Sequence, residues 1–247
     1  MKSITVISFI LCLGFVSCKK ASDRRCLKSV GIDTLRVEPF TTSVGQLFLA
    51  PRLTFVLVQD STNKVVIRGG KNLIDRVALT YEGDKLSIQN KNTCNFLRDY
   101  SRKITVEIHV TTLYTIHFEG TESLSSQGTI YSDWFTLLVR DGAGPVSLKL
   151  FSQSIQASLS HGWGDITLSG KTNYANVTIR SNGSCNTQAL QITDSAAVIS
   201  YTQGDIYLQA PQKLLKAEVN GAGNIYYTGT PQNIMFNRYG TGQLLPN

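Results

Sequence analysis

A short phrase recurs along the second half of the chain at almost constant spacing. Each copy has a glycine-containing turn followed by alternating apolar and polar residues, as in residues 162–168 and 221–227. The anchoring glycines are spaced 20, 19, 21, 19 and 19 residues apart: Gly144, Gly164, Gly183, Gly204, Gly223 and Gly242. A fixed period near twenty residues is typical of a solenoid, in which every coil buries its apolar face against its neighbours.

Alternation within each copy predicts β-strands that pair in parallel, about 4.8 Å apart, with every second side chain pointing inward. One predicted inward column contains Val146, Ile166, Cys185, Ile206, Ile225 and Leu244, and a second contains Leu148, Leu168 and Leu208. We expect three short strands per coil and assign the glycines to sharp corners that require positive φ. The fold class is therefore all-β, a parallel β-helix.

The preceding part of the chain is also rich in strands but lacks the repeat. Short runs with β-branched and aromatic residues, including one predicted strand over 48–58, are separated by turn residues. A single helical turn is predicted at 72–75 and a hairpin turn at 83–85. We expect an irregular β-rich N-terminal lobe over 32–115 and the regular β-helix over 116–247.

The first eighteen residues have the pattern of a bacterial lipoprotein signal. Lys2 precedes an apolar run over 4–16, and Phe15-Val16-Ser17-Cys18 resembles a lipobox. The alternative, a membrane-spanning anchor, needs roughly 20 apolar residues, and this run is shorter. We predict a signal peptide over 1–17, a lipid on Cys18 and a tether over 18–31. The protein is then held at the outer membrane, with the periplasmic side favoured because residues 19–23 lack a run of acids.

The remaining cysteines and the charge exclude some classes of function. Cys26 and Cys94 lie in polar, irregular stretches, and we predict a disulfide between them; the alternative is free thiols. Cysteine spacing matches no zinc site, and we expect no cofactor. The chain has 24 Lys and Arg against 17 Asp and Glu, but they are scattered rather than gathered on one face with aromatic residues, so a nucleic-acid binder is not expected.

Three aromatic residues are the candidate ligand surface. Tyr207 and Tyr226 occupy equivalent outward positions on adjacent coils, and Trp163 lies at a corner beside His161. Exposed aromatic strips of this kind mark sites for a sugar ring or a partner protein. The alternative is an aromatic ladder that only stabilises the sheet.

Catalytic and metal sites have weaker support. Asp165 and Asp205 should lie two coils, about 9–10 Å, apart, near the carboxylate spacing of inverting glycosidases. However, aspartate after glycine is also an ordinary turn residue that bonds to nearby backbone. His109 and His117 are eight residues apart and could form a metal pair, or they are simple strand positions. We predict neither catalysis nor a metal site.

The lipobox, residues 90–95, and the closing phrases 221–231 and 240–242 resemble a family of secreted proteins common among Bacteroidetes. The family is the putative auto-transporter adhesin, head GIN domain, and the resemblance covers residues 32–245. It implies a right-handed parallel β-helix. It brings no catalytic motif that could be carried over to this chain.

The function that follows is a non-enzymatic, adhesin-like envelope lipoprotein whose rigid β-helix surface binds glycan or protein. The alternatives are a carbohydrate-active enzyme, either a polysaccharide lyase or a hydrolase, and a purely structural envelope protein. An open solenoid end also invites a homo-oligomer, unless Pro246 and Asn247 cap it.

Overall fold

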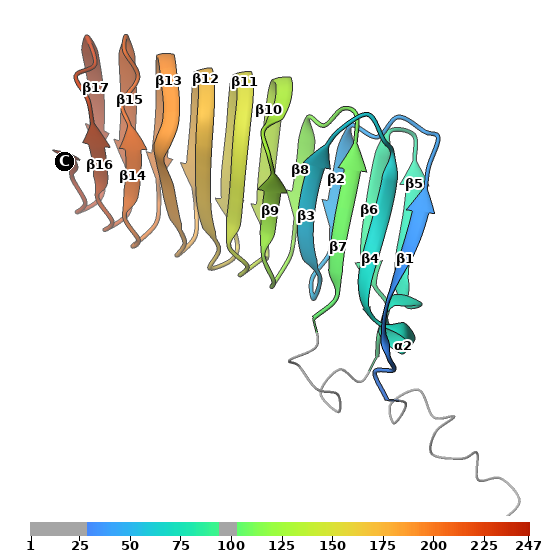
Figure 1. The fold of residues 1–247 in the computed structure, drawn as a ribbon. Helices are drawn as coiled ribbons and strands as arrows, with labels where there is room; N and C mark the ends of the chain where they lie inside the picture. Colours follow the sequence, from blue (N-terminus) through green and yellow to red (C-terminus); the bar gives the residue numbers. More distant parts are fainter. Residues whose placement is uncertain (1–28, 94–102) are drawn as a thin grey trace, which may run out of the picture.

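The computed structural model describes residues 29–93 and 103–247, which form a long stack of β-coils (Figure 1). Nearly all regular structure is strand, and the only helix among the described residues is one short turn. The predicted all-β solenoid is confirmed. The signal peptide, Cys18, Cys26 and Cys94 lie outside the described residues, so lipidation and the disulfide stay predictions.

The C-terminal part of the stack consists of flattened coils with two long sides. In chain order, its strands are β8 (Thr115–Phe118), β9 (Leu124–Gln127), β10 (Ile130–Arg140), β11 (Val146–Ser160), β12 (Asp165–Ile179), β13 (Ser184–Ser200), β14 (Ile206–Gln209), β15 (Leu214–Val219), β16 (Ile225–Thr228), β17 (Asn233–Arg238) and β18 (Leu244–Pro246). Every pairing among them is parallel. Side A contains β9, the first parts of β11 to β13, and β14, β16 and β18; side B contains β8, the last parts of β10 to β13, and β15 and β17.

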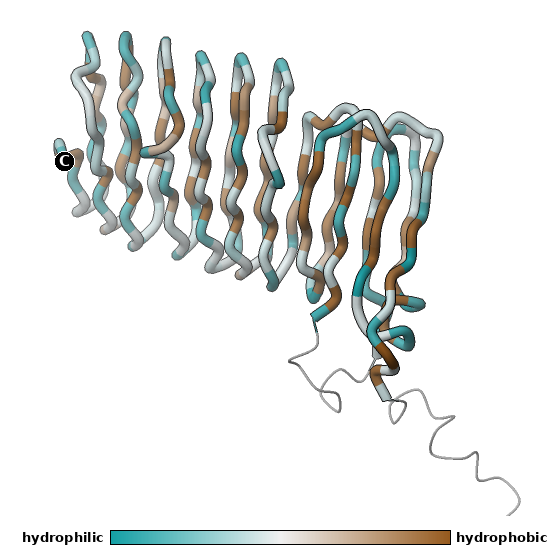
Figure 2. The backbone as a smooth tube through the Cα atoms, viewed as in Figure 1, coloured by the Kyte–Doolittle hydropathy of each residue, from teal (hydrophilic) through white to brown (hydrophobic). Residues whose placement is uncertain are grey.

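The predicted inward columns are confirmed by the strand register. Val146 pairs with Ile166, and the column continues through Cys185 and Ile206 to Leu244 at the last coil. Burial of Cys185 raises the pKa of its thiol to about 12, so this side chain acts as a small apolar residue. Along the regular coils in Figure 2, brown segments alternate with white and teal ones, as expected where successive side chains point in and out.

The anchoring glycines have a different role from the one predicted. None of the six has positive φ; at this corner the left-handed conformation is adopted by Asp141 and His161 instead. Five of the six glycines instead allow close approach of neighbouring coils, and Gly164, where the nearest atom to an added Cβ is 3.3 Å away, is the exception. A Cβ on Gly223 would lie 2.0 Å from the carbonyl oxygen of Gly204, and one on Gly183 would lie 2.1 Å from that of Gly164. We call these six residues the glycine column.

The coils also differ from the predicted three short strands. In β11, β12 and β13 the chain continues as one strand of 15 to 17 residues around the bend that joins side A to side B. The last coils have two strands each. The strand can continue around the bend because buried hydroxyl groups hydrogen-bond to the backbone there.

The N-terminal part begins with strands that run in both directions. Its elements are β1 (Asp33–Pro39), β2 (Gln46–Leu49), β3 (Thr54–Gln59), β4 (Lys64–Gly70), α2 (Lys71–Ile74), β5 (Val77–Glu82), β6 (Lys85–Asn90) and β7 (Thr105–Val110). The helical turn and the β5–β6 hairpin, with Gly83 at φ 62, are confirmed. The single strand predicted over 48–58 is wrong, because the chain turns at Pro51 and Arg52 (φ 67) and separates β2 from β3.

The two parts are hydrogen-bonded into one stack. β2 pairs with both β6 and β8, and β3 pairs with both β7 and β9. The N-terminal end is closed by antiparallel pairings of β1, β4 and β5. At the other end, Ile234 and Phe236 of β17 continue inward columns but are exposed. Self-association through this end stays a prediction.

Candidate functional site

Tyr207 and Tyr226 point outward from β14 and β16, in register with Leu245 on β18. Their rings stack with centroids 5.1 Å apart and an interplanar angle of 11°. The Asn224 side-chain amide lies 3.2 Å from the Tyr226 hydroxyl. Stacking covers one face of each ring, so the inner faces of the pair are closed to a ligand. Stacking also suits the stabilising ladder, and ligand binding by the pair stays a prediction.

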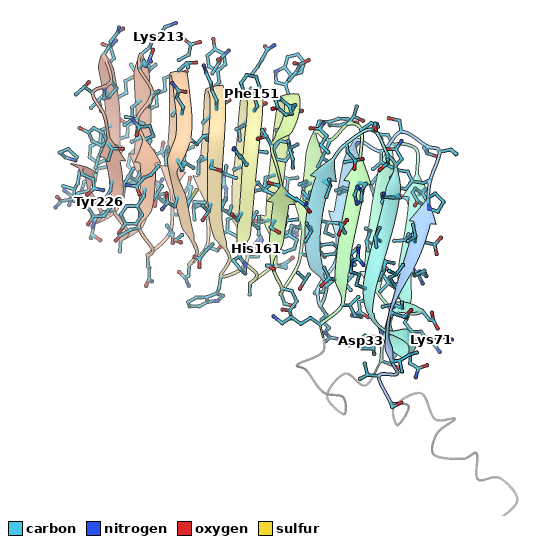
Figure 3. All side chains as sticks on the ribbon, viewed as in Figure 1. Asp33, Lys71, Phe151, His161, Lys213 and Tyr226 are labelled. Carbon is cyan, nitrogen blue, oxygen red and sulfur yellow. The ribbon has the colours of Figure 1, made fainter. Side chains whose placement is uncertain are left out.

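Trp163 lies at the corner formed by the glycine column, where Figure 3 shows His161. Its side chain is 70% exposed, while its backbone N–H donates to the carbonyl of Gly142 at 3.1 Å. The backbone is therefore fixed to the preceding coil and the indole is free to contact a partner. Its role as a ligand surface also stays a prediction.

The two aspartates considered for catalysis join successive coils. Oδ1 of Asp165 accepts hydrogen bonds from the backbone N–H and the hydroxyl of Ser184, at 3.3 and 2.6 Å. Oδ1 of Asp205 accepts one from the backbone N–H of Asn224 at 2.8 Å, and Asn224 repeats the arrangement with Gln243 at 2.9 Å. Both carboxylates therefore hydrogen-bond to the next coil, nineteen residues further along the chain, rather than to the backbone of their own turn.

The two histidines considered for a metal pair, His109 and His117, have separate carboxylate partners. His109 on β7 lies between Asp60 and Glu107, with ring nitrogen to oxygen distances of 2.6 and 2.7 Å. Hydrogen bonds from Thr62 and His109 lower the pKa of Asp60 to about 2. His117 is on β8, which pairs with β2 and β10, whereas β7 pairs with β3 and β4. Its Nε2 lies 3.3 Å from Oε1 of Glu119. In the part of the chain that the structure describes, no group of three or more His, Cys, Asp or Glu could hold a metal ion.

A second aromatic surface was missed by the sequence analysis. At the bend between sides A and B, four aromatic side chains are 49% to 70% exposed: Tyr131, Trp134, Phe151 and Tyr174. We call them the aromatic ridge. Figure 3 shows Phe151 at the opposite ends of the strands from His161, so the ridge and Trp163 occupy different corners of the coils. The repeated glycine phrase marks the corner with Trp163 and gives no signal for the ridge. The signal in the sequence is that Tyr131 and Phe151 lie one period of twenty residues apart.

A hollow lies beside the ridge on side B. It has a volume of about 190 Å³ and is lined by Tyr174, Ser154, Asn176, Ser195 and Lys216, among others. Its remaining lining is apolar and consists of three alanines and a leucine: Ala175, Ala196, Ala197 and Leu214. Next in sequence to two lining residues, Lys213 pairs with Asp194, which lowers the pKa of the carboxyl group and raises that of the ammonium group. The ridge thus borders a concave surface with both apolar and polar lining.

Comparisons with known proteins agree on the fold. A crystal structure described as a "putative adhesin" from Bacteroides fragilis has a TM-score of 0.76 and 19% identity, covering 87% of this chain and 97% of that one. One from Parabacteroides merdae with the same description has a TM-score of 0.66 and 17% identity, covering 89% and 98%. A "putative lipid binding protein" from Parabacteroides distasonis has a TM-score of 0.61 and 19% identity, covering 88% and 97%.

A search of curated sequences gives no match. A family model does match, over residues 46–231, which is most of the chain and extends from β2 to the turn after β16. This agrees with the resemblance carried by the closing glycine phrases. The chain therefore belongs to the family described as "Putative auto-transporter adhesin, head GIN domain".

Proposed function

We propose that this protein is a non-enzymatic, adhesin-like module of the cell envelope whose β-helix surface binds glycan or protein. The observation that carries the proposal is the placement of large aromatic side chains on the outside of a rigid stack, above all Trp163 and the aromatic ridge. Large exposed apolar side chains grouped on a surface mark interaction sites. Backbone pairing on both sides of each central coil holds such a surface in one shape, which lowers the entropy cost of binding.

The test is retention of the purified protein on a panel of envelope and host polysaccharides and proteins, with release of soluble fragments followed in parallel. We expect retention without fragments. Tyr207→Ala, Tyr226→Ala and Trp163→Ala each test one of the contacts predicted from sequence, and loss of a hot-spot aromatic should weaken binding by about tenfold or more. Fragments that disappear in Asp165→Asn or Asp205→Asn would instead make the protein an enzyme.

Anchoring at the envelope is the second part of the proposal. Within residues 29–93 and 103–247, no helix has the length and hydropathy to cross a membrane. A lipid on Cys18 would hold the β-helix at the outer membrane, because buried acyl chains contribute about 0.8 kcal/mol per CH₂ group. The periplasmic side is favoured because residues 19–23 lack a run of acids.

Cys18→Ala is therefore expected to move the protein from the membrane fraction to the soluble fraction and to abolish labelling by a radioactive fatty acid. Cys12→Ala is the matched control, since Cys12 precedes the proposed cleavage site and leaves with the signal. Cell fractionation and labelling measure both. A Cys18→Ala protein that still took up the fatty-acid label would contradict lipid attachment at this residue.

A further inference from the structure

The aromatic ridge is a row of residues on consecutive coils rather than a chance cluster. Tyr131 is in register with Phe151 on the next coil and with Lys171 on the one after it. The Tyr131 and Phe151 rings have centroids 5.6 Å apart and are tilted by 43°. Trp134 and Tyr174 are likewise in register with Ser154 between them. Two coil spacings place these last two about 10 Å apart.

Hydroxyl groups fix the backbone that carries two of the ridge residues. Ser132 Oγ donates to the carbonyl of Trp134 at 2.7 Å, and Thr172 Oγ1 donates to that of Tyr174 at 3.0 Å. Ser152, on the coil between them, makes the same contact two residues ahead at 2.9 Å. Ser152 and Thr172 are buried. The bend is therefore held in one conformation from coil to coil, and its aromatic residues are presented without a further ordering cost.

Tyr131 is held in a different way. Its backbone N–H donates to Oε1 of Gln59 at 2.6 Å, and its carbonyl accepts from Nε2 of the same amide at 3.1 Å. Gln59 belongs to β3, so a side chain from the N-terminal part fixes the first residue of the ridge. The backbone is satisfied while the ring of Tyr131 stays exposed.

The charge around the ridge is positive. Lys149 and Lys171 are exposed beside Phe151 on side A, and Lys216 lines the hollow next to Tyr174 on side B. Among the described residues, none of these three ammonium groups has an ion-pair partner. Two acids that have no ion pair in the described part of the chain lie near these lysines: Asp133, which is exposed at the bend, and Glu218, which is two residues after Lys216 on β15 and accepts a hydrogen bond from Asn220. The three lysines outnumber them. Charge complementarity therefore favours an anionic ligand.

We infer that the aromatic ridge binds an acidic polysaccharide, whose sugar rings pack on Tyr131, Trp134, Phe151 and Tyr174 and whose carboxylates or sulfates pair with Lys149, Lys171 and Lys216. Sugar rings offer flat C–H faces to aromatic rings, and the separation of Trp134 and Tyr174 requires a ligand longer than one ring. The row is a set of single rings on a convex bend, which suits a narrow chain better than the buried central cluster typical of protein interfaces.

This inference rests on the proposed binding function and names its site and ligand class. The probes are polygalacturonate, its fully methyl-esterified form, which is neutral but has the same backbone, and dextran sulfate as a second acidic polymer. We expect the purified protein to bind an acidic polymer about tenfold more tightly than the methyl ester at low salt, and this preference to shrink as salt screens the lysines.

Matched variants separate ring contacts from charge. Tyr131→Ala and Trp134→Ala should weaken binding of every bound polymer by about tenfold, whereas Tyr239→Ala, which removes an equally exposed tyrosine from the last coil, should not. Lys171→Gln should weaken binding of the acidic polymers by about threefold and leave the ester unaffected. Lys71→Gln removes the same charge from α2, far from the ridge (Figure 3), and should leave the binding of every polymer unchanged.

Several outcomes would overturn the inference. The first is equally tight binding of the acidic polymers and the methyl ester. The second is weaker binding in Lys171→Gln but not in Trp134→Ala, which would mean ion exchange only. The third is ridge-dependent binding to anionic lipid vesicles in place of the polymers. Retention on a protein or a neutral glycan that the ridge variants do not alter would also overturn it and leave the proposed function standing. Only the absence of retention on the whole panel would remove the proposed function itself.

Discussion

Gly223→Ala should lower the free energy of unfolding by about 3 kcal/mol. The added methyl group would lie 2.0 Å from the carbonyl oxygen of Gly204 and 2.7 Å from its carbon, both in the backbone of the preceding coil. Backbone atoms cannot rotate away as a flexible side chain can, so the two coils would have to separate locally. The measurement is the denaturation midpoint, followed by circular dichroism.

Two other glycines are controls for this prediction. At Gly164, the nearest atom to an added Cβ is 3.3 Å away, so Gly164→Ala should be close to neutral, aided by a stiffer unfolded chain. Gly128 has φ +87 and open space around it, so Gly128→Ala should cost about 1–2 kcal/mol from conformation alone. If Gly223→Ala and Gly164→Ala unfold at the same denaturant concentration, close coil approach is not what the glycine column provides.

Phe118→Ala should destabilise the protein by about 3–5 kcal/mol. Phe118 on β8 is fully buried and packs edge-to-face on Phe55 of β3, with ring centroids 6.4 Å apart. β8 pairs with β2 on one side and with β10 on the other, so this ring lies where the N-terminal strands meet the regular coils. Phe118→Leu, which keeps most of the volume, should lose much less.

The same variant tests whether the two parts unfold together. Both tryptophans, Trp134 and Trp163, are in the regular coils, whereas circular dichroism reports on every strand. Because the stack is continuous, fluorescence and circular dichroism should shift by the same amount in Phe118→Ala. A shift in circular dichroism with unchanged fluorescence would mean that the N-terminal part unfolds on its own.

The repeat was sufficient to predict the coils because a solenoid has one dominant local constraint, the burial of alternate side chains against the next copy. Register follows from it: Val146, Ile166 and Cys185 must align if each is to be buried. The function of the glycines was not predictable in the same way. Their φ angles are ordinary, and the atom that excludes a Cβ at Gly223 belongs to Gly204, nineteen residues earlier.

Other features depended on contacts that alternation does not describe. An alternating strand reads the same whether it runs parallel or antiparallel, so the antiparallel pairing of β4 with β1 and β7 could not be derived from the sequence. The turn at 83–85 did indicate the antiparallel pair of β5 and β6. Pro51 marks the break between β2 and β3, because proline has no backbone N–H to donate to a neighbouring strand. Trp134 and Tyr174 are two periods apart, and the equivalent residue on the coil between them is Ser154. Because the aromatic residue does not repeat on each coil, the sequence does not show that the two share a position on the bend.

Because the regular coils contact only the coils before and after them, their number can change without altering the columns on either side. Duplication or loss of a gene segment of 19 to 21 codons would lengthen or shorten the molecule by about 4.8 Å, and the antiparallel strands at the N-terminal end would be untouched. Relatives are then expected to diverge in length by whole coils. In such proteins, the length of the stack can evolve separately from the side chains on its outer surface.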